Sequence, residues 1–91
     1  MEHKKILKIV NDLGLHGRAA AKIVELTRQY ESNLYFKKNG NEEVDGSNIL
    51  SILTLSGNKG SEVEARAVGS DSKELIDDLS RLFEEKFGEA K

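Results

Sequence analysis

The 91-residue sequence contains no cysteine, no proline and no tryptophan, and it has only two histidines. The lack of cysteine excludes disulfide bonds, thiolate metal sites and cysteine nucleophiles. Two histidines without a third ligand at metal spacing leave no zinc site, so we expect no metal and no cofactor. No apolar run approaches the roughly 20 residues that span a bilayer, and the start Met1-Glu2-His3-Lys4-Lys5 lacks the apolar stretch of a secretory signal. We therefore expect a cytoplasmic protein without membrane insertion.

An excess of charge of one sign is also lacking. Fourteen Lys and Arg residues face 16 Asp and Glu residues, which gives a formal net charge of -2. Such a chain has no general electrostatic attraction to nucleic acid or to an anionic membrane, so any recognition of an anion has to be local. The length predicts a single domain, residues 1–91, with one modest two-layer core.

Hydrophobic periodicity predicts the element order βαββαβα. Alternating residues predict strands at 5–10, 34–37 and 62–67, and the Asn39-Gly40 turn predicts a short returning strand at 43–45. Helical spacing predicts a helix of about four turns from His16 through Tyr30 and a short helix within 49–55. It also predicts a last helix that opens with a capping box, Asp71-x-x-Glu74, and ends near residue 88. Single-face alternation favours an α+β fold in which three helices cover one face of a four-stranded, mainly antiparallel sheet.

The stretch Leu13-Gly14-Leu15-His16-Gly17-Arg18 places an imidazole where a strand-to-helix turn ends and the helix begins. The first backbone N–H groups of a helix have no internal partner, and the macrodipole adds about half a positive charge there, so anions bind at this end. We interpret His16 as a nucleophile whose phosphoryl group would be held by the backbone of Gly17 and Arg18 and by the Arg18 guanidinium. The alternative is that His16 is a half-exposed polar residue that only begins the helix.

The run 49–55 contains five apolar residues in seven, too many for a short helix to bury. Ile52 and Leu55 can share a buried stripe. Ile49, Leu50 and Leu53 would then form an exposed apolar patch, which usually marks a partner surface. The alternative is a strand or a wholly buried helix.

Other polar residues have simpler explanations. His3 lies in a charged N-terminal tail and is expected to be solvated. The neighbouring carboxylates at 42–43 and 77–78 diverge on either a helix or a strand, so neither pair indicates general acid and base catalysis.

The segment Leu13-Gly14-Leu15-His16-Gly17-Arg18-Ala19-Ala20 resembles the active-site signature of the HPr phosphocarriers of the bacterial phosphotransferase system, usually G-[LIM]-H-[AT]-R-P-A. The element order, the turns at 39–40 and 59–60 and the short apolar helix also match that family over nearly the whole chain. The resemblance implies an HPr-like open-faced β-sandwich and a phosphoryl-group carrier rather than a free-standing enzyme.

What the resemblance implies for the site is equally specific. His16 would accept a phosphoryl group on Nδ1 from phosphorylated enzyme I and pass it to an enzyme IIA-type acceptor. Arg18 and the helix N-terminus would steady the phosphate. We expect a monomer whose partner-binding residues are Ala21, Ile49, Leu50 and Leu53.

Three positions depart from the family pattern. Ala19 stands where the family has proline, and Gly17 stands where it has alanine or threonine, so the turn should be looser and phosphotransfer slower. Asn48 stands where many HPr proteins of Gram-positive type have a serine that a regulatory kinase phosphorylates, and Ser47 is one residue early.

Further details resemble the nitrogen-related paralogue NPr more than the sugar-type HPr. They are Leu13 directly before Gly14, an extra residue in the turn at 39–44, the aliphatic run at 49–53, and the chain ending at 82–89. These details predict a regulatory, nitrogen-related phosphotransferase system.

Two other function classes have to be weighed against a phosphocarrier. An HPr-like regulatory adaptor that binds partners without efficient phosphotransfer is compatible with Gly17 and Ala19, whereas the intact His16 and Arg18 favour transfer. A four-stranded nucleic-acid module needs stacking aromatic residues and a basic sheet face. The outward residues offer one aromatic ring and mixed charge, so we expect no nucleic-acid partner; they are Tyr35, Lys37, Glu64 and Arg66.

Overall fold

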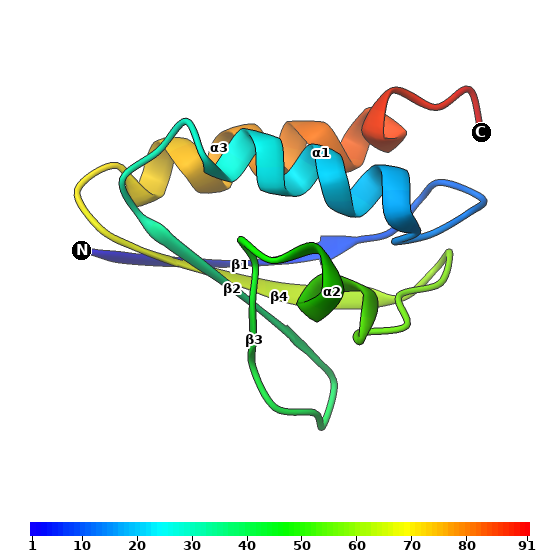
Figure 1. The fold of residues 1–91 in the computed structure, drawn as a ribbon, viewed down its shortest axis with the longest axis horizontal. Coiled ribbons are helices and arrows are strands. Elements are labelled where there is room, and N and C mark those ends of the chain that lie inside the picture. Colours follow the sequence, from blue (N-terminus) through cyan, green and yellow to red (C-terminus); the bar gives the residue numbers. More distant parts are fainter.

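The computed structural model describes residues 1–91 and contains a four-stranded sheet and three α-helices. The elements are β1 (Glu2–Lys8), α1 (Gly17–Thr27), β2 (Asn33–Lys38), β3 (Val44–Asp45), α2 (Ile49–Leu53), β4 (Glu62–Val68), α3 (Ser72–Glu84) and the short 3-10 helix η1 (Lys86–Gly88). The strand order is β1-β4-β2-β3, and all neighbouring strands are antiparallel. Helices α1 and α3 lie side by side over one face of the sheet (Figure 1), so the predicted fold class is confirmed.

The central strand β4 shows why the helices cover one face only. Its alternation buries Val63, Ala65 and Ala67, whereas the residues between them stay partly exposed on the other face. Ala65 lies opposite Lys5 of β1 and Phe36 of β2 in the sheet register. Small alanine side chains at the middle of the sheet leave room for the larger side chains of α3, which packs over β1 and β4.

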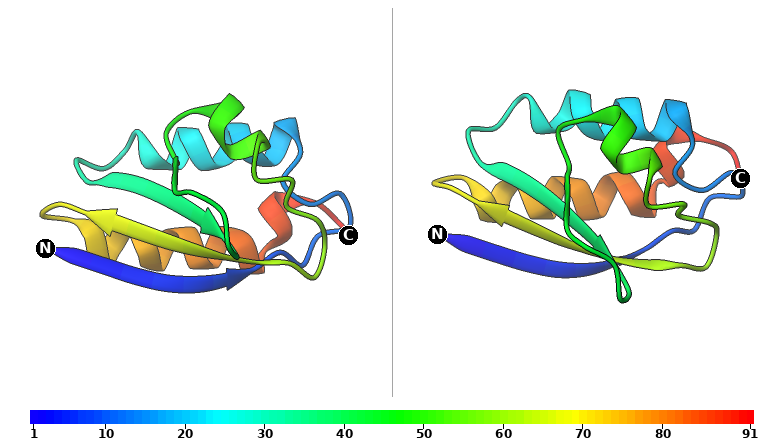
Figure 2. Two further views of the ribbon diagram at one scale, coloured as in Figure 1. Left: turned by 90° about the horizontal axis from the view of Figure 1, so that it is seen from below. Right: turned by 60° about the horizontal axis from the view of Figure 1, so that its bottom comes forward.

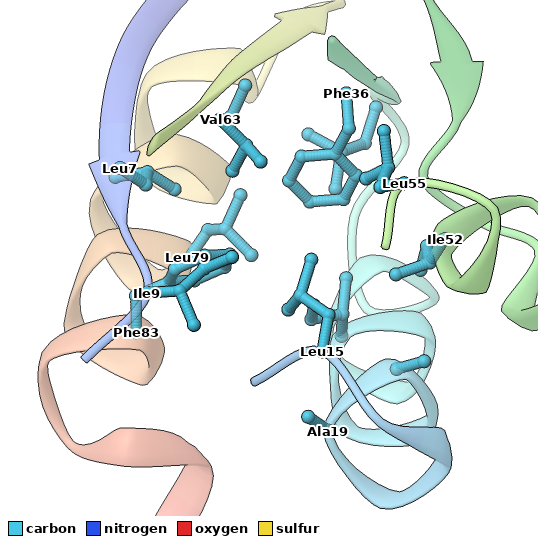
Figure 3. Close-up of a cluster of buried hydrophobic side chains, with 14 of the residues drawn as sticks. Leu7, Ile9, Leu15, Ala19, Phe36, Ile52, Leu55, Val63, Leu79 and Phe83 are labelled. Carbon is cyan, nitrogen blue, oxygen red and sulfur yellow. The ribbon is translucent and has the colours of Figure 1, made fainter. Parts of the chain in front are cut away.

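One hydrophobic cluster fills the space between the sheet and the helices (Figure 3). Its aromatic part joins three elements, because the Phe83 ring of α3 lies 6.3 Å from the Phe36 ring of β2 and 4.9 Å from the Phe87 ring of η1, measured between centroids. All three rings are almost fully buried. The last turn of the chain is therefore anchored in the same core as the sheet.

Helix α1 is shorter than predicted, with 11 residues or about three turns. Beyond Thr27 the backbone forms tighter turns, in which Gln29 N–H donates to the Leu26 carbonyl at 3.0 Å and Tyr30 N–H donates to the Thr27 carbonyl at 3.1 Å. Tyr30 therefore lies outside the helix, and its hydroxyl donates to Asp78 of α3.

The expectation that His3 is solvated in a tail is wrong. Strand β1 begins at Glu2, because it pairs with β4 as far as Val68, and this places His3 inside the sheet. The His3 Nδ1 and the Ser72 Oγ form a hydrogen bond of 2.8 Å. The first strand is thus tied to the start of α3.

The predicted capping box of α3 is also wrong. Asp71 occupies the position before the helix, but its side chain makes no capping hydrogen bond. Its carboxylate instead accepts from the backbone N–H groups of Glu31 and Ser32, each at 2.9 Å, and from the Ser32 hydroxyl. These hydrogen bonds, led by that of the Ser32 hydroxyl, hold the pKa of Asp71 below its usual value. Asp71 therefore joins the α1–β2 loop to the start of α3.

Candidate functional site

His16 lies directly before the first residue of α1, as predicted. Its backbone is extended (φ −83°, ψ −179°), its Nδ1 accepts from the Arg18 backbone N–H at 3.3 Å, and its carbonyl accepts from Ala20 N–H at 2.9 Å. The backbone N–H groups of Gly17 and Ala19 make no hydrogen bond. The ring nitrogen Nδ1 therefore sits at a helix terminus that has donors free for an anion.

The loop that precedes His16 is locked against a second loop, at residues 56–60. Leu15 N–H donates to the Gly57 carbonyl at 2.8 Å. Gly14 has a φ of +67°, and a Cβ there would lie 2.3 Å from the Gly57 oxygen, so only glycine fits. Gly17 is different, because a Cβ there would meet nothing within 4 Å. The contact between the two loops therefore requires glycine at position 14, whereas position 17 has room for a side chain.

Arg18 and Ala21 face solvent. Both residues are exposed, and the Arg18 guanidinium has no ion pair or hydrogen bond. The guanidinium is therefore not committed to another side chain and is available to an incoming anion beside His16.

Two residues that the sequence did not point to complete the surroundings of His16. The His16 Nε2 forms a hydrogen bond with the Glu89 Oε2, and the other Glu89 oxygen accepts from the Asn11 Nδ2 at 3.0 Å. The Asn11 amide is fully buried and also donates to the Gly14 carbonyl at 2.9 Å. The Gly14 carbonyl and the Glu89 carboxylate are both acceptors, so they must face the NH₂ group of Asn11, and this fixes the orientation of its amide.

The carboxylate of Glu89 is well shielded, since its side chain is only 11% exposed. The hydrogen bond from Asn11 lowers the pKa of Glu89 from its usual value, and the hydrogen bond with His16 and the positive charge of Arg18 act in the same direction. Burial opposes them and is outweighed. Glu89 is therefore ionised beside the imidazole at neutral pH.

The chain end reaches His16 because Phe87 is buried. After α3 the backbone turns through three residues in the left-handed region, Lys86 (φ 58°), Phe87 (φ 57°) and Gly88 (φ 80°). The Lys22 Nζ of α1 donates to the Phe87 carbonyl at 2.6 Å and fixes this turn against the helix. The final residues thus come to lie beside the loop between β1 and α1 (Figure 2).

The apolar patch Ile49, Leu50 and Leu53 is exposed, as predicted. Leu50 is 74% exposed, whereas Ile52 and Leu55 are buried. Asn48 begins α2, and its Oδ1 accepts from Ser51 N–H at 3.1 Å. Because α2 packs against α1, the patch lies on the helix that adjoins the one that His16 begins.

The structure contains no helix with the length and apolar character needed to cross a membrane. No group of three or more His, Cys, Asp or Glu side chains lies together as a metal site would require.

Comparison with known proteins agrees with this geometry. The family model described as the PTS HPr component phosphorylation site matches residues 3–85. This chain belongs to the HPr family of the phosphotransferase system. A phosphocarrier protein HPr from Xylella fastidiosa is 35% identical over 98% of this chain and 97% of its own length. A phosphocarrier protein NPr from Proteus mirabilis is 32% identical over 98% of this chain and 99% of its own.

Solved structures of the HPr family share the fold. The crystal structure of HPr-C-His from Thermoanaerobacter tengcongensis superposes with a TM-score of 0.91 at 34% identity and covers 98% of this chain and 99% of that one. Membership of the family supports a phosphocarrier role in the phosphotransferase system. The sequence identities to the HPr protein and to the NPr protein are similar, so they do not distinguish the two subtypes, and the nitrogen-related subtype stays a prediction.

Proposed function

We propose that this protein carries a phosphoryl group on Nδ1 of His16 between two proteins of the phosphotransferase system. The observation that carries this proposal is the position of Nδ1. This nitrogen accepts a hydrogen bond from Arg18 N–H, so it has a lone pair, and it lies at a helix N-terminus where the N–H groups of Gly17 and Ala19 are free.

The chemistry follows from these contacts. The Nδ1 lone pair attacks phosphorus and forms an N–P bond, while the bond from phosphorus to the donor breaks and its electron pair stays with the donor. Nδ1 then has no lone pair for Arg18 N–H, which transfers its hydrogen bond to a phosphate oxygen. The guanidinium of Arg18 is exposed and unpaired, so it can add a second, charge-assisted contact.

The donor in this proposal is phosphorylated enzyme I and the acceptor is an enzyme IIA-type protein, in a regulatory, nitrogen-related system. Both would dock on Ala21 and on the apolar patch Ile49, Leu50 and Leu53. These side chains are exposed on α1 and α2, which pack against each other. An exposed apolar cluster is typical of a protein interface.

Labelling with enzyme I and phosphoenolpyruvate tests the proposal. The wild-type protein should gain one phosphoryl group that is labile in acid and stable in base. The His16→Ala variant should gain none, and a His3→Gln variant, which changes the other histidine of the chain, should label as the wild type does. Labelling of His16→Ala at the wild-type level would show that the assigned site is wrong.

A regulatory adaptor is the second candidate, because Gly17 and Ala19 replace residues that stiffen this turn in the family. An adaptor would bind enzyme I or an acceptor without becoming labelled. Measuring binding and labelling on the same sample separates the two functions, and parallel transfer to nitrogen-type and sugar-type IIA proteins tests the subtype.

A further inference from the structure

We propose that Glu89 is a positioning residue that holds His16 in the tautomer with its proton on Nε2, and so keeps Nδ1 as the nucleophile. The proposal rests on the proposed function of His16. Glu89 lies beyond residues 3–85, the part of the chain that the family model matches, so it extends the site past the family signature.

Both ring nitrogens of His16 have a partner, and the two partners require the same tautomer. An ionised carboxylate can only accept, so Nε2 must carry the proton that it shares with Glu89. A backbone N–H can only donate, so Nδ1 must be unprotonated where it meets Arg18. The hydrogen bonds on opposite sides of the ring therefore select one tautomer.

The carboxylate is itself held in place by a buried group. The Asn11 Nδ2 donates to the Glu89 Oε1 at 3.0 Å and to the Gly14 carbonyl at 2.9 Å, and Asn11 is fully buried. These two hydrogen bonds leave the Glu89 Oε2 directed at the imidazole. The arrangement resembles the histidine and carboxylate pairs in which a third group orients a base.

No other carboxylate takes the place of Glu89. Asp12, in the loop before His16, is paired with Lys59 at 2.7 Å, and Arg18, whose charge acts on Glu89, is a cation. Glu89 is thus the only carboxylate bonded to the imidazole.

This contact also serves the transfer step. As the Nδ1–P bond forms and the donor keeps the electron pair of the broken bond, the imidazole ring gains a positive charge. The Glu89 carboxylate accepts the Nε2–H hydrogen bond and stabilises that charge. When the phosphoryl group leaves for an acceptor nucleophile, the electron pair of the N–P bond returns to Nδ1 and the ring becomes neutral again.

The Glu89→Gln variant gives the sharpest test, because the surroundings decide which way its amide turns. Asn11 donates to Oε1, so the glutamine oxygen would occupy that position and its NH₂ group would face His16 Nε2. A donor at Nε2 requires the proton on Nδ1, which removes the nucleophilic lone pair. We expect initial phosphorylation by enzyme I to fall by more than about tenfold, as wrong-tautomer variants do elsewhere.

Glu89→Ala and Glu85→Gln are the matched comparisons. In Glu89→Ala the His16 Nε2 can bond to water, so phosphorylation by enzyme I should be slower than in the wild type yet faster than in Glu89→Gln. A merely structural role would give the reverse order, since glutamine keeps the size of glutamate. Glu85→Gln removes the same charge from an exposed position at the end of α3 and should leave the rate unchanged.

Nitrogen-15 NMR of the imidazole supplies a readout that needs no phosphoryl donor. The wild type should show the Nε2–H tautomer of His16, and Glu89→Gln should show a shift toward Nδ1–H. Wild-type rate and tautomer in Glu89→Gln would overturn the positioning role while leaving the proposed function intact. A wild-type protein that shows the Nε2–H tautomer but is never labelled would support the positioning contact and overturn the proposed function.

Discussion

Replacing Leu50 by glutamate should separate partner binding from folding. Leu50 is 74% exposed, so only about a quarter of its side chain is protected from water in the free protein. Full burial of a leucine is worth about 1.5–3 kcal/mol, so the substitution should lower the free energy of unfolding by about 0.5 kcal/mol. Ile52 lies two residues further along α2 with 0% exposure, and Ile52→Ala should cost about 2–5 kcal/mol.

Among variants that stay folded, Leu50→Glu should slow phosphorylation more than Ile52→Ala does, although it costs less stability. A carboxylate at position 50 would be desolvated and unpaired in an apolar interface, so transfer from enzyme I to Leu50→Glu should slow by at least about tenfold, or roughly 1.4 kcal/mol. Ile6→Lys is the control, because Ile6 is also exposed but lies in β1, opposite Glu64. It should leave the rate unchanged.

Denaturant unfolding and initial transfer rates measure the two effects on the same preparations. If Leu50→Glu unfolds the protein while Ile52→Ala does not, the burial pattern of α2 is wrong by about half a turn. If Leu50→Glu is stable and is phosphorylated at the wild-type rate, the apolar patch is not the docking surface for enzyme I.

Three further predictions follow from single contacts. Gly17→Ala should stabilise the protein by about 0.4–1 kcal/mol, because a Cβ meets no neighbour there, whereas Gly14→Ala should destabilise it by at least about 1–2 kcal/mol, because its φ is positive and the Gly57 oxygen is too close. Unfolding in denaturant compares the two variants, and equal effects would contradict the different surroundings of the two glycines. Asp71 and Glu89 have lowered pKa values in the folded state, so the stability that they contribute is fully present only above their usual pKa values of 3.8 and 4.5 and is lost as the pH falls through the folded values. As the pH is lowered through this range, the melting temperature of the wild type should therefore fall more steeply than that of Asp71→Asn or Glu89→Gln, and parallel profiles would contradict this. The hydrogen bond to Asp78 raises the pKa of Tyr30 to about 12. In Tyr35→Phe, which leaves Tyr30 as the only tyrosine, the phenolate absorbance should therefore appear near pH 12, and a midpoint near 10 would show that the contact is absent in solution.

The fold could be predicted where a local pattern decides the structure. Strict alternation at 62–67 was enough to assign β4 and its buried face, since a strand covered on one side has that period and no other. Asn48 begins α2 through a signal of the same local kind, because its Oδ1 accepts from a backbone N–H three residues later. Both signals lie within a few residues of the structure that they specify.

The predictions for Asp71 and His3 are wrong because both side chains contact distant segments of the chain. Asp71-x-x-Glu74 has the sequence of a capping box, yet the Asp71 carboxylate bonds Glu31 and Ser32, about 40 residues away in the chain. The charged residues around His3 give no sign of its partner, because Ser72 is 69 residues away in the chain. A local pattern is not sufficient when a distant donor competes for the same side chain.

The candidate site likewise combines residues that a local motif predicts with a residue that only a long-range contact brings in. His16 and Arg18 were predictable from one short motif, whereas Glu89 contacts His16 from 73 residues away. One signal could have found it: Phe87 is an aromatic residue in an otherwise charged chain ending and has to be buried. Its burial against Phe83 brings the following residues toward the first loop.

The helix terminus alone does not fix the imidazole that it presents. The hydrogen bond from Arg18 N–H to Nδ1 is long, at 3.3 Å, and exposed, and no neighbour lies within 4 Å of a Cβ at Gly17. The contact on the other side of the ring comes from Glu89, whose partner Asn11 is fully buried. The local motif therefore places Nδ1 beside the free N–H groups of the helix terminus, and tertiary packing through Phe87 and Asn11 positions the Glu89 carboxylate that leaves this atom its lone pair. For this reason a change at the chain end should alter the chemistry of His16 without altering the motif around it.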